Sequence, residues 1–281
     1  MNLLKRCLVA AAAVPAIYLL VRLGSLYLAF FLAALAALAA WEFYSLARRK
    51  ELKPMASPGI VLAAVLPVVT YLVIEADCAA WLRAGFMLSF LVVALSAVIL
   101  MSRDTTEGAL AGISVTVFGI LYTGGLFSFQ VLLRHGPHYP ALQGFKWLFL
   151  VYLVTWGVDV GSYACGRLFG RHKLCPSLSP GKTVEGFAGG IIFAAAVSYL
   201  AGAGVFGIMA PGPAVLFGIV LSLVAPAGDL VESIFKRDAG VKDSSSLIPG
   251  HGGVLDRFDS LLFTAPAAVL FRYIIFHAAG H

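Results

Sequence analysis

The chain has 281 residues, of which 60% are hydrophobic and 12% are charged, and its mean hydropathy is +0.93. This composition excludes a water-soluble globular protein and predicts an integral membrane protein, because a membrane-spanning helix needs roughly 20 mostly apolar residues. The net charge of +6 could indicate nucleic-acid binding. In a membrane protein, however, the positions of lysine and arginine matter more than their sum, so we expect no nucleic-acid partner.

Nine apolar segments follow one another along the chain, separated by charged residues, prolines and glycines. They lie near residues 7–23, 25–47, 59–76, 82–101, 109–133, 147–165, 187–209, 214–235 and 258–277. The stretches between them are short, so we expect an all-α polytopic membrane protein with about nine transmembrane helices. We predict a single integral membrane domain, 1–281, in which 1–146 forms the N-terminal helices and 147–281 the helices of the candidate site.

The distribution of cations predicts the orientation in the membrane. The first segment follows Lys5 and Arg6 and is similar to a signal peptide, but a second apolar run resumes directly after Gly24, so we expect a retained hairpin. With the N-terminus in the cytoplasm, most of the 20 lysines and arginines lie on the cytoplasmic side, as the positive-inside rule requires. The C-terminus is then outside, and the long polar loops 166–186 and 236–257 share the cytoplasmic face.

The first polar loop contains residues suited to phosphate binding: Ser179, Lys182, Thr183 and Glu185. The sequence around Lys182 is similar to a nucleotide-binding P-loop, but that pattern needs glycine where the chain has Pro176, and a preceding buried strand, so we reject it. Lys182 provides a point charge, and the first amides of the helix beginning near Thr183 can face an anion. For Ser179 and Thr183, ligand binding and helix capping are equally good interpretations, with Glu185 in the first turn.

Several carboxylates lie inside or beside apolar segments. A charge at membrane depth costs roughly 2.5 kcal/mol or more, so it usually has a partner or a function. For Asp159 we prefer a place in the functional site over an ion pair with Arg167 or Lys182. Glu42 and Glu75 lie near the ends of their segments, and for these we prefer a structural role.

Two further pairs of acidic residues flank the second polar loop. Pro226 is expected to kink or unwind its helix just before Asp229, and Asp229 and Glu232 then share one helical face. Asp256 and Asp259 stand three residues apart at the start of the last segment. We predict that Asp229 and Asp256 share a hard cation such as Mg²⁺, which prefers carboxylate oxygens.

The second polar loop concentrates charged residues and glycines that can bind phosphate: Lys236, Arg237, Lys242, Asp243, His251, Gly252, Gly253 and Arg257. Arginine suits bidentate contact with phosphate, and glycine lets the backbone approach a ligand. Anchoring by the positive-inside rule would explain Lys236 and Arg237. It does not explain Lys242, Asp243 or His251.

From Ser233 to Asp259 the sequence resembles, without a gap, the signature of the bacterial phosphatidate cytidylyltransferases, or CDP-diacylglycerol synthases. The matching residues are Ser233, Phe235, Lys236, Arg237, Lys242, Asp243, Ser245, Ile248, Pro249, His251, Gly252, Gly253, Val254, Asp256, Arg257, Phe258 and Asp259. The segments around Asp159 and at 179–186 are similar to other motifs of that family. Many relatives have a lysine where this chain has Gly181, so Lys182 is expected to carry more of the phosphate contact.

The resemblance implies a multispanning enzyme of the bacterial cytoplasmic (inner) membrane that converts CTP and phosphatidate to CDP-diacylglycerol and diphosphate. It implies Mg²⁺ held by Asp229 and Asp256, and it leaves a second cation and a homodimer open. The catalytic residues expected from it are Asp229, Asp256, Lys182, Lys242, Asp243 and Asp259. The expected substrate-binding residues are Ser179, Lys182, Thr183, Glu185, Lys236, Arg237, His251, Gly252, Gly253, Arg257 and Asp159.

The expected chemistry needs charge neutralisation more than a strong base. A phosphate monoester has a second pKa near ~6 and is largely ionised at neutral pH, so His251 is expected to donate to phosphate or orient its loop. A membrane transporter for an anionic solute is the alternative function. Its charges would surround a midplane pathway, whereas these gather toward one face. A CDP-alcohol phosphotransferase is disfavoured because its aspartate-rich motif does not occur.

Overall fold

The computed structural model divides into two compact units. The described residues are 14–76, 107–136, 141–176, 178–248 and 252–278. The first unit comprises residues 1–139 and 238–257, and the second comprises 140–237 and 258–281. The segment 238–257, called the signature loop below, therefore belongs with the N-terminal helices.

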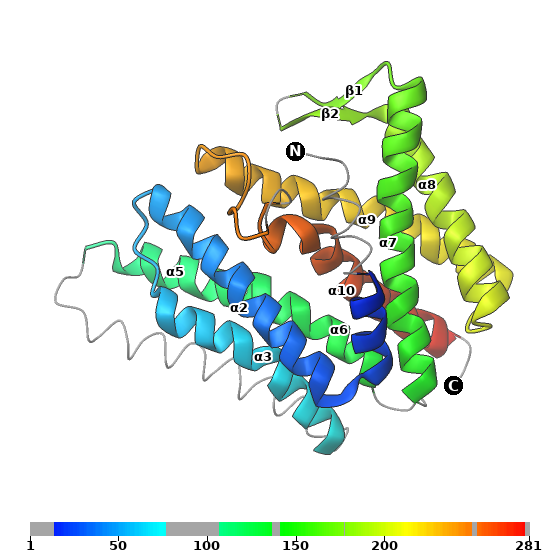
Figure 1. Cartoon of the computed structure of the whole chain (residues 1–281), viewed down its shortest axis with the longest axis horizontal. Coiled ribbons are helices and arrows are strands. Elements are labelled where there is room, and N and C mark those ends of the chain that lie inside the picture. The colour runs from blue at the N-terminus through cyan, green and yellow to red at the C-terminus, as the bar shows by residue number, and fades with distance from the viewer. Residues whose placement is uncertain (1–13, 77–106, 137–140, 177, 249–251, 279–281) are drawn as a thin grey trace. The chain divides into compact units, whose positions relative to one another are not determined.

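Among the described residues, seven helices are long and apolar enough to cross a membrane (Figure 1). They are Ser25–Arg49, Ala56–Ala76, Ala109–His135, Ala141–Phe169, Val184–Val205, Pro211–Asp238 and Leu255–Ile275. A shorter apolar helix, Val14–Leu23, covers part of the first predicted segment. The segment 82–101 lies outside the described residues, so the number nine stays a prediction. The expectation of a helical, polytopic chain is confirmed.

The first unit is built from helices that close around one buried tyrosine. Its labelled elements are α2 (Ser25–Arg49), α3 (Ala56–Ala76), α5 (Ala109–Ile120), the π-helical η1 (Leu121–Gly125) and α6 (Leu126–His135). Tyr44 of α2 is fully buried, and its hydroxyl donates a 2.8 Å hydrogen bond to the carbonyl oxygen of Thr116. A Cβ atom at Gly59 of α3 or Gly119 of α5 would collide with the Tyr44 ring. Glycines at these positions therefore let three helices approach one another closely, as in other membrane proteins.

The second unit contains four long helices and one hairpin. Its elements are α7 (Ala141–Phe169), β1 (Lys173–Cys175), β2 (Ser179–Thr183), α8 (Val184–Ser198), the π-helical η2 (Tyr199–Val205), α9 (Pro211–Asp238) and α10 (Leu255–Ala278). Asp238 at the end of α9 and the first three residues of α10 belong to the first unit. Small residues line the contact between α7 and α8: a Cβ atom at Gly189 would collide with Cys165, and one at Gly190 with the Ser162 hydroxyl.

The β1–β2 hairpin departs from the purely helical expectation. Lys173 pairs with Thr183 and Cys175 with Ser179 in a two-stranded antiparallel sheet. The chain must reverse between the end of α7 and the start of α8, which lie side by side (Figure 1). Antiparallel pairing satisfies the backbone groups of this return segment, and hydropathy gives no signal for so short a hairpin.

Helices α9 and α10 approach closely at Gly228. A Cβ atom there would collide with the backbone carbonyl of Asp259. The helix α9 remains helical through Pro226, so the expected unwinding of the backbone does not occur. Acidic residues after Gly228 on α9 and near the start of α10 are thereby brought together.

Candidate active site

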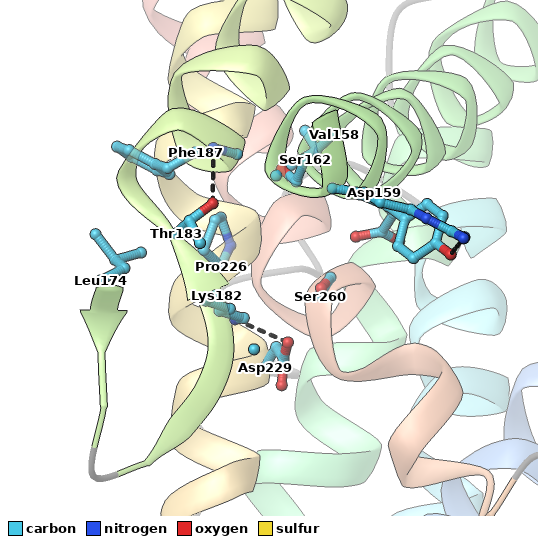
Figure 2. Close-up of a pocket in the computed structure, with 15 residues that line it drawn as sticks. Val158, Asp159, Ser162, Leu174, Lys182, Thr183, Phe187, Pro226, Asp229 and Ser260 are labelled. Atoms are coloured by element: carbon cyan, nitrogen blue, oxygen red, sulfur yellow. Dashed lines mark hydrogen bonds and ion pairs between the residues drawn. The ribbon is translucent and has the colours of Figure 1, made fainter. Parts of the chain in front are cut away.

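A cavity of about 450 Å³ lies within the second unit, among α7, the hairpin, α8, α9 and α10 (Figure 2). Charged groups of both signs line it, namely Asp159, Arg167, Lys182 and Asp229. Leu174, Phe187 and Val158 provide an apolar part of the wall. The cavity therefore combines groups for an anion and a cation with surface for an apolar chain.

Lys182 and Asp229 meet at this cavity. The Nζ atom of Lys182 lies 2.8 Å from Oδ2 of Asp229, and the two side chains are 25% and 37% exposed (Figure 2). The other carboxylate oxygen of Asp229 accepts a 3.2 Å hydrogen bond from the Ser233 hydroxyl. The strand β2 provides the lysine and α9 the aspartate, so two predicted site residues from separate parts of the sequence are brought together.

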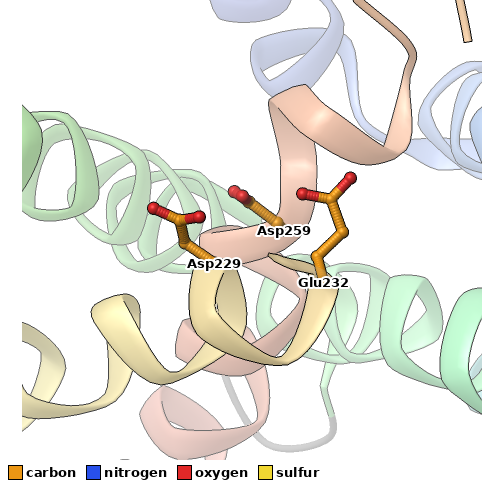
Figure 3. Close-up of side chains that lie close together, drawn as sticks. All are labelled: Asp229, Glu232 and Asp259. Atoms are coloured by element: carbon orange, nitrogen blue, oxygen red, sulfur yellow. The ribbon is translucent and has the colours of Figure 1, made fainter. Parts of the chain in front are cut away.

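An acidic cluster adjoins this ion pair. Asp229 and Glu232 of α9 and Asp259 of α10 each offer a carboxylate oxygen, and these atoms lie within 4.8 Å of one another (Figure 3). Glu232 is fully buried and forms a 2.6 Å ion pair with Lys236, one helical turn further along α9. Lys236, predicted to bind substrate, is therefore placed against Glu232. Three hard oxygen donors at this spacing fit a divalent cation.

Asp256 is positioned by the signature loop. Its Oδ2 atom accepts hydrogen bonds from the Ser244 amide at 2.9 Å, the Ser244 hydroxyl at 2.7 Å and the Gly253 amide at 2.8 Å. Asp256 and Asp229 belong to different units, so their predicted sharing of a cation stays a prediction. The carboxylates that the structure groups with Asp229 are Glu232 and Asp259, and no metal-binding role was predicted for Glu232 from the sequence.

Thr183 and Glu185 organise the ends of the hairpin. Thr183 is the N-cap of α8, and its hydroxyl accepts a 3.1 Å hydrogen bond from the Gly186 amide, which supports the capping interpretation. The same side chain also borders the cavity. Glu185 accepts hydrogen bonds from the backbone amides of Arg171 and His172 and lies 2.6 Å from the His172 ring. Its observed contacts thus hold the hairpin to the start of α8.

The remaining predicted residues fall into three groups. Arg237, Lys242, Asp243 and Arg257 are exposed. Gly252 has a φ of +80°, which glycine adopts without strain, and Gly253 is buried. Ser179 lies at the start of β2, and His251 lies outside the described residues.

Glu42, for which a structural role was expected, contacts the signature loop, a partner that the sequence did not indicate. Glu42 is fully buried in α2, and four donor groups of the signature loop lie within hydrogen-bond distance of its carboxylate. A carboxylate within an apolar segment was the available signal. Its position near the end of the segment favoured a structural interpretation, because only tertiary structure shows which loop it reaches.

Comparison with known proteins agrees with these features. The phosphatidate cytidylyltransferase of Staphylococcus epidermidis is 34% identical over 248 residues, covering 86% of this chain and 88% of that protein. The phosphatidate cytidylyltransferase of Bacillus subtilis is 34% identical over 271 residues, covering 93% and 94%. That of Mycobacterium tuberculosis is 38% identical over 174 residues, covering 60% of this chain and 51% of that protein. The cytidylyltransferase family matches residues 4–275, a range that includes Lys182, Asp229 and the signature loop, so this chain belongs to the cytidylyltransferase family.

Proposed function

We propose that this chain is a phosphatidate cytidylyltransferase, which transfers the cytidylyl group of CTP to phosphatidate and releases diphosphate, in phospholipid biosynthesis. Its family and the names of its relatives support this activity. The observation that carries the proposal is the Lys182–Asp229 pair at the cavity. One group suits a phosphate and the other a cation, and both are needed when two polyanionic substrates react.

The acidic cluster is the proposed cation site. Asp229, Glu232 and Asp259 would hold Mg²⁺, with Asp256 as the further ligand that the sequence predicts. When bound, the cation supplies charge neutralisation at the phosphate oxygens. A second cation remains part of the proposal, since the family resemblance leaves room for one.

The reaction needs little proton transfer. A phosphate oxygen of phosphatidate forms a bond to the α-phosphorus of CTP, and the bond from that phosphorus to the diphosphate oxygen breaks, so diphosphate leaves with the electron pair. Lys182 orients a phosphate from the wall of the cavity, while exposed Lys242, Arg237 and Arg257 add positive charge. Catalysis then rests on positioning and electrostatic stabilisation, as is general for phosphoryl transfer.

The proposed substrates, a lipid and a nucleotide, place the active site at a membrane surface. We propose that the chain lies in the bacterial cytoplasmic membrane with its N-terminus inside, its C-terminus outside and its active site toward the cytoplasm. The seven membrane-length helices and the positive-inside distribution of cations support this orientation. An apolar part of the cavity wall suits the lipid substrate, and a homodimer is proposed from the resemblance alone.

The deciding experiment measures diphosphate release by the full chain in membranes. We expect release only when both CTP and phosphatidate are present, with CDP-diacylglycerol formed in equal amount. Diphosphate release that depends on neither CTP nor phosphatidate would contradict the proposal. Solute flux across vesicles without cytidylyl transfer would also contradict it and would favour the transporter interpretation. Replacement of phosphatidate by diacylglycerol is the matched control, because it removes only the attacking phosphate.

A further inference from the structure

The fully buried carboxylate of Glu42 in α2 joins two arms of the signature loop. On one arm, its Oε1 atom accepts a 2.7 Å hydrogen bond from the Ser245 hydroxyl. On the other arm, Oε1 accepts from the Val254 amide at 2.9 Å, and Oε2 accepts from the Leu255 amide at 2.7 Å. One side chain therefore holds two segments of the loop that lie on either side of residues 249–251 in the sequence.

The position of these arms matters because each adjoins predicted site residues. The first arm follows Lys242 and Asp243 directly. The second arm runs into Asp256 and Arg257 at the start of α10. A change in the distance between the two arms would displace all four groups at once.

The Ser244 hydroxyl lies between the carboxylates of Glu42 and Asp256. It lies 3.1 Å from Oε2 of Glu42 and 2.7 Å from Oδ2 of Asp256. A hydroxyl has one proton to donate, so the two carboxylates compete for it, and the shorter contact favours Asp256. Glu42 then accepts from the Ser245 hydroxyl and from the Val254 and Leu255 amides. Asp256 is held by Ser244 and by the Gly253 amide.

Gly253 leaves the space that Glu42 occupies. A Cβ atom at this position would collide with both carboxylate oxygens of Glu42 and with the Ser244 hydroxyl. The glycine is therefore required because a buried carboxylate lies against the backbone, independently of any substrate. This is a second, separate observation that couples Glu42 to the signature.

We infer that Glu42 is a positioning residue for cytidylyl transfer: it orders the signature loop and, by accepting from the Val254 and Leu255 amides, fixes the backbone that leads directly into Asp256. The catalytic part of this inference rests on the proposed function, because it assumes that the reaction is cytidylyl transfer. Its structural part, the ordering of the loop by a buried carboxylate, has a readout that does not depend on activity. Groups that orient the residues of a site typically change metal affinity or activity by about 10- to 100-fold when removed.

The test uses the purified full chain with Glu42→Gln and, as a matched control, Glu75→Gln. Glu75 is an exposed glutamate near the end of α3, so its replacement removes the same charge without touching the loop. Glutamine keeps the size of the Glu42 side chain but replaces one carboxylate oxygen by an NH₂ group. This group is a donor and cannot accept the hydrogen bond that the oxygen accepted from the loop. We expect Glu42→Gln to lower kcat by about 10- to 100-fold. We also expect Glu42→Gln to show faster amide hydrogen exchange in peptides that contain Val254 and Leu255. Glu75→Gln should equal the unsubstituted protein in both kcat and hydrogen exchange.

The two measurements separate the possible failures. If the unsubstituted chain releases no diphosphate from CTP and phosphatidate, the proposed function fails, and hydrogen exchange alone decides whether Glu42 orders the loop. If the unsubstituted chain is active, unchanged exchange in Glu42→Gln overturns the inference, as does altered exchange with an unchanged kcat. A mere loss of folded protein, with normal kcat in the folded fraction, also overturns it.

A double substitution tests the shared space. Gly253→Ala should lower activity strongly when Glu42 is present, because the new methyl group and the carboxylate collide. In a Glu42→Ala background the methyl group no longer meets the carboxylate and has only the Ser244 hydroxyl to displace, so the same change should cost several-fold less activity. If the two activity losses simply multiply, Glu42 and Gly253 act independently and the proposed coupling is wrong.

Discussion

Lys182 of β2 and Asp229 of α9 form an ion pair of 2.8 Å at the cavity of the second unit. Both side chains are partly exposed, and a pair of this kind typically contributes only about 0–1 kcal/mol. A phosphate can therefore replace Asp229 at the lysine, and a cation can replace Lys182 at the aspartate, without a large loss. The ion pair therefore keeps a positive and a negative group at the cavity, and a bound phosphate and cation can take the place of the contact between them.

Asp229→Asn should weaken the response to the cation. The amide retains the shape of the side chain but removes the negative charge, so we expect the Mg²⁺ concentration for half-maximal diphosphate release to rise by about 10- to 100-fold. Asp238→Asn is the matched control on the same helix, because Asp238 is exposed and forms its ion pair with Lys50. Near-normal Mg²⁺ dependence in Asp229→Asn would remove Asp229 from the cation site.

Lys182→Ala should raise the KM for CTP or for phosphatidate by roughly 10- to 100-fold, because a hydrogen bond to a charged group contributes about 1.5–3 kcal/mol. Lys173→Ala, on the paired strand of the same hairpin, provides the control, since Lys173 is exposed and does not line the cavity. Steady-state kinetics with each substrate varied in turn measures both variants. Equal kinetics for the two variants would show that Lys182 makes no specific contact with substrate.

Gly228→Ala should disturb the approach of α9 to α10. The added methyl group meets the carbonyl of Asp259, and overpacking of this kind costs about 1–3 kcal/mol of stability. We expect a lower unfolding temperature in detergent together with a weaker Mg²⁺ response, because Asp229 and Asp259 are pushed apart. Gly212→Ala is the control, since nothing lies within 4 Å of a Cβ atom there. A variant that is destabilised but has unchanged Mg²⁺ dependence would contradict the link between this helix contact and the cation site.

Glu185→Gln should loosen the hairpin and affect substrate affinity more than kcat. The carboxylate accepts from two backbone amides and contacts the His172 ring, and glutamine can replace only part of this set. Because Lys182 lies on the strand that leads into Glu185, we expect a several-fold higher KM for CTP. Hydrogen exchange of residues 171–184 gives an independent readout of the hairpin. If KM rises while exchange stays unchanged, Glu185 contacts the substrate directly.

The sequence alone determines the membrane class and most of the helices. Apolar length is a local property, and seven of the nine predicted segments correspond to long helices with similar bounds, although α7 and α8 extend further into the polar loop than hydropathy indicates. The hairpin between them was not predicted, because strands of three and five residues are too short to show a distinct hydropathy pattern. It forms because two adjacent helix ends require the chain to reverse.

The sequence predicted many of the residues of the candidate site but few of the contacts among them. Lys182 and Asp229 were both expected from their chemical types, and the structure brings them together. The grouping of Asp229 with Glu232 and Asp259 depends on the close approach at Gly228, which the sequence shows only as a glycine. The pairing of Asp229 with Asp256 stays a prediction.

What the sequence by itself determined is the chemistry available to this protein: apolar segments of membrane length, carboxylates, and cations in a recognisable signature. Only the tertiary structure decided which of these groups meet. Glu42 shows the reason most clearly, because it contacts Ser245 and Leu255 across 203 and 213 positions of the chain. Hydrogen bonding and close packing act over a few ångströms in space, whatever the separation in sequence, so the role of a buried carboxylate depends on which segments the fold places beside it.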